Sequence, residues 1–302
     1  MNIVDIIKSI EGTDTGALVA LVLAMLSAMA HALFGAVLKS GDPILNRGAI
    51  NVCYGVVAAP LALFVAPWPS DDLWPILFAV YLIHFAYEWF QAKSFEHGAF
   101  VLVYPIGRGS GPLLIALAAL FVFGERLAWN QWFGILLISG GILALAQVNL
   151  RSAVKKGENM RGLRLAIGFA LGTGVLIAVY TTVDAYGIRL ADNPFTFLAW
   201  FFFTGLFSSP IIAILKYRRL EVPIDKGALF ARGLLGAMIA VISFGSVMLA
   251  TRLGQVATVA ALRETSIIFA TALGVYVFKE QVTASRLLLI GLIAFGAVMV
   301  EL

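Results

Sequence analysis

Charged side chains that interrupt apolar stretches are the residues of this chain best suited to chemistry. Each is costly in a bilayer unless it meets a partner, water or a ligand. Two arginines can bind a carboxylate, phosphate or phosphonate through parallel N–H groups. A surplus carboxylate can hold the ammonium of a zwitterion or take up a proton. The charges therefore predict a binding site for a small anionic or zwitterionic molecule, built from Arg108, Arg263, Glu88, Asp184 and Glu264.

The surroundings of these residues leave alternatives open. Glu88 lies near the end of its stretch, where it could sit at the membrane interface or serve as the counter-ion of Arg108. Asp184 is expected to face an internal cavity. Arg263 and Glu264 are adjacent, and adjacent residues on a helix point about 100° apart. One of them could therefore face the cavity while the other pairs elsewhere.

His31, Tyr104 and Tyr180 are the uncharged candidates. His31 could be a neutral histidine bonded to a backbone carbonyl, or it could line the path and carry a proton or touch the substrate. Most aromatic residues in membrane proteins pack or lie in the interface belts. The two tyrosines are nevertheless expected to line the same cavity.

Arg108 lies in the sequence Tyr-Pro-Ile-Gly-Arg-Gly-Ser-Gly-Pro, residues 104–112. Proline removes a backbone donor, and glycine allows non-helical angles and close backbone approach. Irregular backbone at membrane depth is tolerated where it lines a cavity or is buried in protein. This stretch predicts a broken or kinked helix that presents a cation to an internal site. The alternative is a kinked packing helix whose arginine reaches the headgroups. The residues expected to provide the hinge are Pro105, Gly107, Gly109, Gly111 and Pro112.

The elements that must position these residues are membrane-spanning helices. Of the 302 residues, 61% are hydrophobic and 13% are charged, whereas soluble domains are about a quarter charged. A span needs about 20 apolar residues. The sequence predicts an all-α membrane protein in a lipid bilayer, with spans at about 16–38, 47–66, 73–92, 99–121, 127–147, 163–187, 195–215, 228–250, 255–277 and 284–301.

Several function classes are not expected. The three histidines, His31, His84 and His97, have no metal-ligand spacing, and no phosphate-binding loop is present. A single cysteine, Cys53, cannot form an intramolecular disulfide or a cysteine metal cluster. The net charge of +4 comes from basic residues between spans, so nucleic acid is not expected as a partner. We expect no enzyme, no cofactor and no metal.

The chain repeats itself after five spans. A shift of 155 residues places Arg108 on Arg263, Ser110 on Thr265 and Glu125 on Glu280. Because five is odd, the second half must enter the membrane from the opposite side, as in inverted-repeat secondary transporters, whose substrate sites lie near the midplane. The expected organisation is an N-terminal interfacial segment, a five-helix repeat, a basic linker and a second five-helix repeat, at residues 1–15, 16–148, 149–162 and 163–302.

Charge and helix-end patterns give two further expectations. Most of the 21 lysines and arginines fall in alternate loops, which predicts that these loops are cytoplasmic and that both termini are outside. Glu125 and Glu280 are expected to begin the fifth and tenth helices, where a carboxylate complements the helix dipole. The glycines expected to allow close helix packing are Gly134, Gly140, Gly141, Gly291 and Gly296.

The chain resembles the EamA branch of the drug/metabolite transporter superfamily over residues 16–301. The resemblance rests on the ten spans, the five-plus-five repeat and the first half's ending, Phe-Gly-Glu-Arg-Leu at 123–127 and Ser-Gly-Gly at 139–141. The stretches at 31–42, 104–112 and 180–186 resemble one subgroup, of which some relatives are linked to phosphonate use. Relatives are commonly drawn with cytoplasmic termini, which conflicts with the charge pattern.

The second half departs from this pattern. Lys279 replaces Gly124, and no proline corresponds to Pro105. The ninth span is therefore expected to be a straighter helix than the fourth.

Together these features predict a secondary transporter that moves a small-molecule substrate across a bacterial-type inner membrane by alternating access. The substrate would be polar and anionic or zwitterionic, for example amino-acid-like. Export is commoner in the resembling family, and coupling to protons is one possibility. The alternatives are a flippase for a lipid-linked headgroup and a non-transporting receptor or scaffold. The sequence does not give the substrate, the direction of transport or the oligomeric state.

Overall fold

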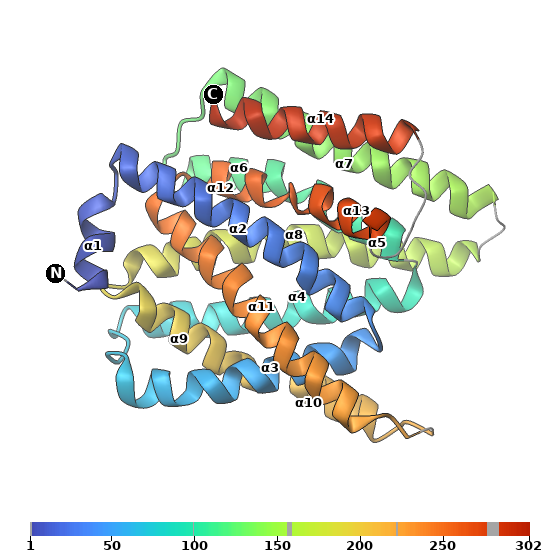
Figure 1. Cartoon of the computed structure of the whole chain (residues 1–302), viewed down its shortest axis with the longest axis horizontal. Helices are drawn as coiled ribbons and strands as arrows, with labels where there is room; N and C mark the ends of the chain where they lie inside the picture. Colours follow the sequence, from blue (N-terminus) through green and yellow to red (C-terminus); the bar gives the residue numbers. More distant parts are fainter. Residues whose placement is uncertain (1, 99, 156–158, 222, 277–283) are drawn as a thin grey trace. The chain divides into compact units, whose positions relative to one another are not determined.

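The structure is a computed structural model that describes residues 2–98, 100–155, 159–221, 223–276 and 284–302 (Figure 1). No strand occurs among these residues. Ten helical stretches in this described part are long and apolar enough to cross a membrane, which confirms the predicted number of spans. They are Asp14–Leu38, Pro43–Val65, Leu73–His97, Val103–Val122, Trp129–Val148, Met160–Leu190, Pro194–Tyr217, Lys226–Leu253, Val256–Leu273 and Ala284–Glu301.

The chain forms two compact units. Unit 1 consists of residues 1–85 and 183–254, and unit 2 consists of residues 86–182 and 255–302. Two long helices, α4 (Leu73–His97) and α8 (Met160–Leu190), belong partly to each unit. Each unit therefore draws on both halves of the sequence.

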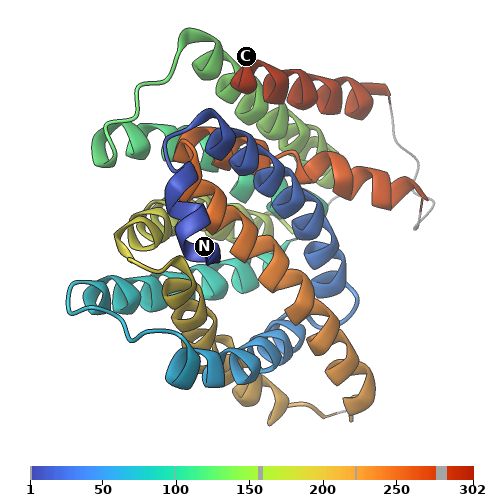
Figure 2. The same ribbon diagram turned by 60° about the vertical axis from the view of Figure 1, so that its left-hand side comes forward.

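Unit 1 is built around a pair of long helices, α2 and α11, which lie side by side (Figure 2). Its core contains Phe34 of α2, Ile50 of α3, Phe202 of α9 and Phe244 of α11. Besides its parts of α4 and α8, the unit contains α1 (Ile3–Ile10), α2 (Asp14–Lys39), α3 (Pro43–Pro60), η1 (Leu61–Val65), α9 (Pro194–Thr204), η2 (Gly205–Phe207), α10 (Ser209–Tyr217) and α11 (Lys226–Leu253).

Short polar residues start the helices of this unit. Thr13, Asp42, Asn193 and Asp225 each accept a hydrogen bond from a backbone N–H in the first turn of the helix that follows. Such caps satisfy N–H groups that have no partner inside the helix. Pro60 ends the regular part of α3, because it lacks an N–H, and the chain continues as the wider turn η1.

The segment before the first span forms its own helix, α1. Ile7 is buried against the unit, while Ile3 and Ile6 are exposed. An exposed apolar edge is what an interfacial helix requires. Contact of this helix with a membrane surface stays a prediction.

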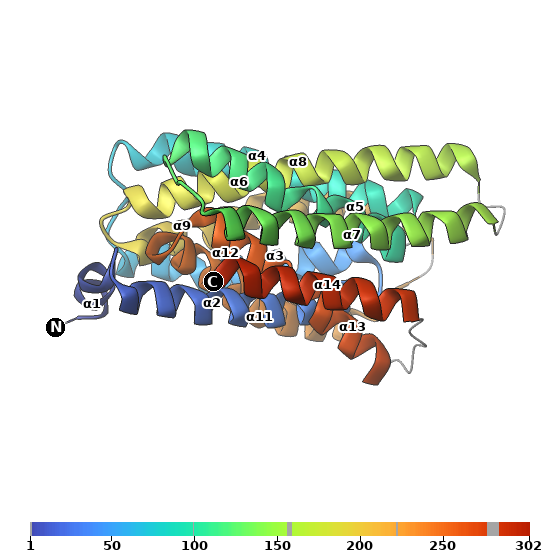
Figure 3. The ribbon, with the colours of Figure 1, turned by 90° about the horizontal axis from the view of Figure 1, so that it is seen from above.

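Unit 2 contains the helices that carry most of the predicted site. Two of its long helices, α7 and α14, lie side by side (Figure 3). Besides its parts of α4 and α8, the unit contains α5 (Phe100–Gly109), α6 (Gly111–Val122), α7 (Trp129–Lys155), α12 (Val256–Arg263), α13 (Ser266–Tyr276) and α14 (Ala284–Glu301).

Glycine allows α7 and α14 to approach closely. A Cβ on Gly134 would lie 2.5 Å from the carbonyl oxygen of Gly296, and a Cβ on Gly296 would lie 2.8 Å from that of Gly134. Gly141 is similarly close to Ile293. The packing role predicted for these three glycines is confirmed. For Gly140 and Gly291 it is wrong, because no described atom lies within 4 Å of a Cβ built there.

Replacing Gly134 tests this contact. Gly134→Val should force α7 and α14 apart and cost about 1–3 kcal/mol of stability, measured as a lower Tm of the purified protein in detergent. Gly140→Val, on the same helix but facing open space, is the matched control and should change stability by about 0.5 kcal/mol or less. Equal losses in both variants would contradict the close contact.

Candidate functional site

Arg108 and Glu264 form a buried ion pair in unit 2. Arg108 Nε donates to Glu264 Oε2 at 2.9 Å, and both residues are only 2% exposed. Arg108 is the second-last residue of α5, and Glu264 directly follows the end of α12. Glu264 is therefore the carboxylate that compensates Arg108, as a buried charge requires.

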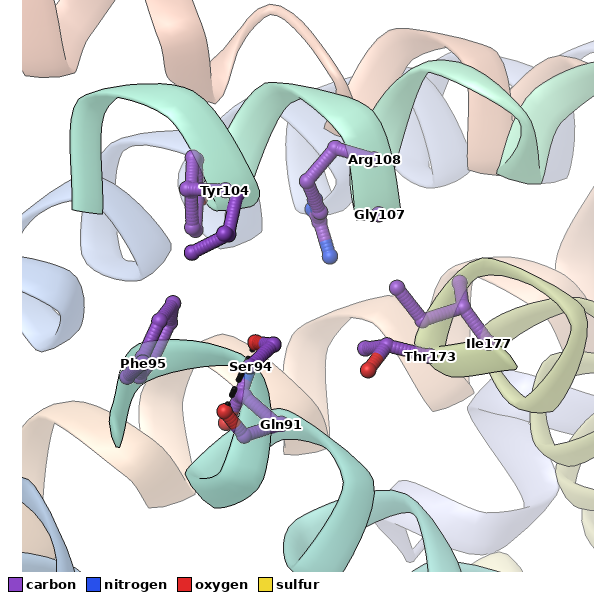
Figure 4. A pocket seen from close by; sticks show the side chains of 9 residues that line it. Gln91, Ser94, Phe95, Tyr104, Gly107, Arg108, Thr173 and Ile177 are labelled. Carbon is purple, nitrogen blue, oxygen red and sulfur yellow. Dashed lines mark hydrogen bonds between the residues drawn. The ribbon is translucent and has the colours of Figure 1, made fainter. Parts of the chain in front are cut away.

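The ion pair uses only part of the Arg108 guanidinium. Its terminal nitrogens, Nη1 and Nη2, are buried, and neither has a hydrogen-bond partner among the described residues. Figure 4 shows the guanidinium pointing into the space between α4 and α8. An arginine carries five N–H donors in a planar fork. The fork is thus fixed at one edge by Glu264 and presents its other donors to the cavity.

The cavity is small and mixed in character. About 220 Å³ of space that no atom fills lies among its lining residues, and this figure includes space open to solvent. Tyr104 places its ring 5.9 Å from the Arg108 guanidinium carbon. The lining residues come from α4, α5 and α8 and are Gln91, Ser94, Phe95, Val103, Tyr104, Gly107, Arg108, Thr173 and Ile177.

The hydroxyl protons of Ser94 and Thr173 are already engaged. Ser94 donates its hydroxyl to the carbonyl of Gln91, and Thr173 donates to the carbonyl of Phe169. The side-chain amide of Gln91 donates to the Tyr87 hydroxyl at 2.8 Å. The Arg108 nitrogens are therefore the cavity's cationic donors, and a ligand at this position has to supply acceptors.

Small residues bring α5 and α8 close together at the cavity wall. A Cβ on Gly174 would lie 2.1 Å from the Ser110 hydroxyl and 2.8 Å from the carbonyl oxygen of Gly107. No side chain larger than hydrogen fits at that position without displacing α5. The contact fixes the stretch that carries Arg108 against α8.

The predicted interruption of the fourth span is present. α5 ends at Gly109, α6 begins at Gly111, and Ser110 lies between them. Pro105 lies inside α5, and Pro112 lies in the first turn of α6. Proline is tolerated in a first turn, where the N–H has no helical partner. Whether this interruption acts as a hinge stays a prediction.

The prediction of a straighter ninth span is wrong. That span is also interrupted, because α12 ends at Arg263 and α13 begins at Ser266. Thr265 causes the break without a proline: its hydroxyl and its backbone N–H both bond to the carbonyl of Leu262, three residues earlier. Such local bonds compete with the helical pattern. The repeat places Thr265 on Ser110, so both spans break at corresponding positions.

The prediction that Glu125 begins the fifth helix is also wrong. Its carboxylate accepts from the backbone N–H groups of Val256 and Ala257 at 2.8 and 3.2 Å. It therefore caps α12 at the start of the ninth span, whereas α7, the fifth span, begins at Trp129. Free N–H groups at a helix start attract a carboxylate from anywhere in the fold. Glu280 lies outside the described residues.

Most of the other predicted residues of unit 2 are also buried. Glu88, on α4, and Arg263, at the end of α12, are both buried. The rings of Tyr87 and Tyr180 contact edge to face, with centroids 4.9 Å apart. Tyr104 lines the cavity. Tyr180 thus contacts the tyrosine that accepts the hydrogen bond from Gln91.

His31 and Asp184 belong to unit 1. His31 is buried, with its Nδ1 3.4 Å from the Ser243 hydroxyl and its ring against Phe34 and Phe244. Asp184 is 4% exposed and pairs with His84, whose Nε2 lies 2.9 Å from Asp184 Oδ2. His84 is not among the residues that the sequence predicted for the site. The criterion that selected His31, a polar residue inside an apolar span, applies equally to His84.

Comparison with known proteins decides the family. The model of the EamA-like transporter family matches residues 14–147 and 164–302, which is most of both halves. The chain belongs to the EamA-like transporter family. It is therefore a membrane transporter of the drug/metabolite type, as the resemblance implied, with two repeated halves.

A search among curated proteins finds no match to this EamA-like transporter. Among solved structures, one titled "Crystal structure of protein" is similar over 95% of this chain and 98% of its own, with 20% identity and a TM-score of 0.74. At this identity the similarity concerns the fold. The substrate has to be argued from the residues of the transporter itself.

A double-mutant cycle tests the Arg108–Glu264 pair. Glu264→Leu should cost about 3–5 kcal/mol, because it leaves a buried arginine uncompensated. The double variant Arg108→Leu/Glu264→Leu should lose clearly less than the two single variants combined, measured by Tm in detergent. Additive losses would contradict a direct interaction.

Removing the cap of α12 should have a smaller effect. Glu125→Ala should cost about 1–2 kcal/mol, since two N–H groups lose their acceptor and the helix dipole loses its charge. Glu221→Ala, at an exposed position, is the control and should leave Tm unchanged. Unchanged Tm for Glu125→Ala as well would mean that the cap contributes nothing.

Proposed function

We propose that this transporter moves a small polar metabolite, anionic or zwitterionic and for example amino-acid-like, and that Arg108 binds its anionic group. The observation that carries this proposal is the buried guanidinium whose Nη1 and Nη2 have no described partner and point into a cavity. Burying such donors without an acceptor is costly. A ligand that supplies two oxygens removes this cost.

The shape of the donor set favours an oxyanion. Two parallel N–H groups of one guanidinium match a carboxylate or a phosphate in bidentate fashion. Glu264 holds the Nε edge of Arg108 at 2.9 Å, so the fork keeps its direction while the ligand binds and leaves. The cavity is small, which disfavours a bulky hydrophobic compound.

Other predicted residues complete the proposed binding site. Arg263, buried at the end of α12, is a second cation for the anionic end. Glu264 is engaged with Arg108, so Glu88 is the carboxylate of unit 2 that we assign to an ammonium group of a zwitterion. Tyr104 and Tyr180 line the binding region, and His31 lines the path in unit 1.

The mode of transport follows from the family and the helix pattern. We propose alternating access in a bacterial-type inner membrane, in the export direction, with the interruptions at Ser110 and Thr265 as the points where the backbone can bend. Two interrupted spans at repeat-related positions support this, since discontinuous helices form the substrate sites of inverted-repeat transporters. The two alternatives, a flippase and a non-transporting receptor, do not carry a flux of small anions. Neither of them would therefore require the fork of Arg108.

Arg108→Lys is the sharpest test of this site. A lysine keeps the charge beside Glu264 but cannot present the bidentate fork. In a thermal-shift screen with L-glutamate, L-serine, succinate, inorganic phosphate and methylammonium, an oxyanion compound should stabilise the wild-type protein. The variant should need at least about tenfold more of that compound, a loss of about 1.4 kcal/mol.

The control for this screen is Arg164→Lys, at an exposed position of α8, which should bind like the wild type. Stabilisation by methylammonium alone, unchanged in Arg108→Lys, would contradict the proposal and move the site to the carboxylates. Uptake of the stabilising compound into proteoliposomes would separate a transporter for it from a receptor.

A further inference from the structure

A second pair of titratable groups, which is partly buried, lies in unit 1 and has no part in the anion site. His84 of α4 and Asp184 of α8 approach to 2.9 Å between Nε2 and Oδ2. Their side chains are 12% and 6% exposed. The second carboxylate oxygen, Asp184 Oδ1, is buried and has no hydrogen-bond partner among the described residues. The carboxylate is therefore only half satisfied.

An aromatic ring packs against this pair, beside an apolar core. The ring of Phe201, on α9, stands edge-on to His84 with centroids 5.0 Å apart. The neighbouring core contains Leu77, Ile188 and Met248, from α4, α8 and α11. A net charge is costly in such an environment. The charge state of the pair therefore depends on the protons it holds.

Several titratable groups lie on the helices that pack around the pair. On α4, Tyr81 donates its hydroxyl to the carbonyl of Phe207, and Glu88 follows one turn after His84. On α8, Arg189 is engaged with the carbonyls of Thr251 and Gly254 at the end of α11. From α9 the ring of Phe201 contacts His84, and from α11 Arg252 donates to the carbonyls of Ile188 and Ala191 beyond Asp184. The next buried imidazole of the unit, His31, contacts Phe244, which in turn contacts Phe201.

We propose that His84 and Asp184 form a proton-binding site, and that the proton it carries is the coupling ion of transport. With one ring N–H on His84 and an ionised Asp184, the pair carries a net charge of −1. Uptake of one proton by the imidazole gives an imidazolium beside a carboxylate, with a net charge of zero. The apolar surroundings favour the neutral state, and access of water favours release of the proton.

The position of the pair suits coupling. Unit 1 ends at Phe85 on α4 and resumes at Val183 on α8, so the pair lies beside the residues at which both helices leave the unit. α4 and α8 are also the two helices that supply Gln91, Ser94 and Thr173 to the anion cavity. The coupling role rests on the proposed function, whereas proton binding itself does not.

Nitrogen NMR of the histidine rings tests proton binding directly. The chain has three histidines, so ¹⁵N-histidine-labelled protein in lipid nanodiscs gives three sets of signals, and His84→Gln identifies those of His84. Between pH 8 and pH 5, His84 should pass from the singly to the doubly protonated form. In Asp184→Asn, which removes the counter-ion, it should stay singly protonated over the same range. A third variant, Asp184→Glu, keeps a carboxylate and should restore the change.

Two results would overturn the proton site. One is a His84 that shows no change between pH 8 and pH 5 in the wild-type protein, a measurement that needs no variant to fold. The other is the same protonation curve in the wild type and in Asp184→Asn. His31, whose Nδ1 lies 3.4 Å from the Ser243 hydroxyl, is the internal control, and its signals should not respond to Asp184→Asn.

A transport measurement tests the coupling separately. Proteoliposomes would be given labelled L-glutamate, L-serine or succinate, whichever stabilises the protein, with and without a pH difference across the membrane. The pH difference should raise accumulation at least threefold for the wild type and not for His84→Gln. A wild type that ignores the pH difference overturns the coupling role. Absence of any uptake overturns the proposed function, while the proton site is still decided by the His84 signals.

Discussion

The apolar solvent around this protein imposes the constraint on which the rest of the structure depends: a charge inside it must be compensated by another part of the chain. Arg108 meets this constraint through Glu264, with 2.9 Å between Nε and Oε2. Both residues lie at helix ends, where the backbone leaves the regular path and side chains can reach inward. The ion pair therefore depends on both helix interruptions, because each interruption positions one of the two charged residues.

The two interruptions show how different local chemistry gives the same outcome. In the fourth span, glycines flank Ser110 and a proline opens the next helix. In the ninth span, Thr265 bonds back to Leu262 and needs no proline. What the repeat preserves is the position of the break and the arginine near it. The means of breaking the helix differs between the halves.

Composition and local pattern predicted the parts of the fold that depend on neighbouring residues. The ten spans follow from runs of apolar residues, and the break at 104–112 follows from its prolines and glycines. Pairings between distant residues did not follow, since nothing near Glu125 indicates that it caps α12, and nothing near His84 indicates Asp184 as its partner. The straight ninth span was predicted wrongly because a missing proline was given more weight than the threonine at the position of Ser110. Of the candidate site, the residue types were predictable, but not which of them share a unit.

The sequence separation of the buried ion pair has a consequence for how the protein is made. Glu264 follows Arg108 by 156 residues. At a synthesis rate of about 5–20 residues per second, the arginine is made roughly 8 to 30 s before its counter-ion. During that interval Arg108 lacks the counter-ion that it has in the finished fold, so the fourth span enters lipid at a cost of a few kcal/mol. The buried ion pair can form only after the ninth span has been made.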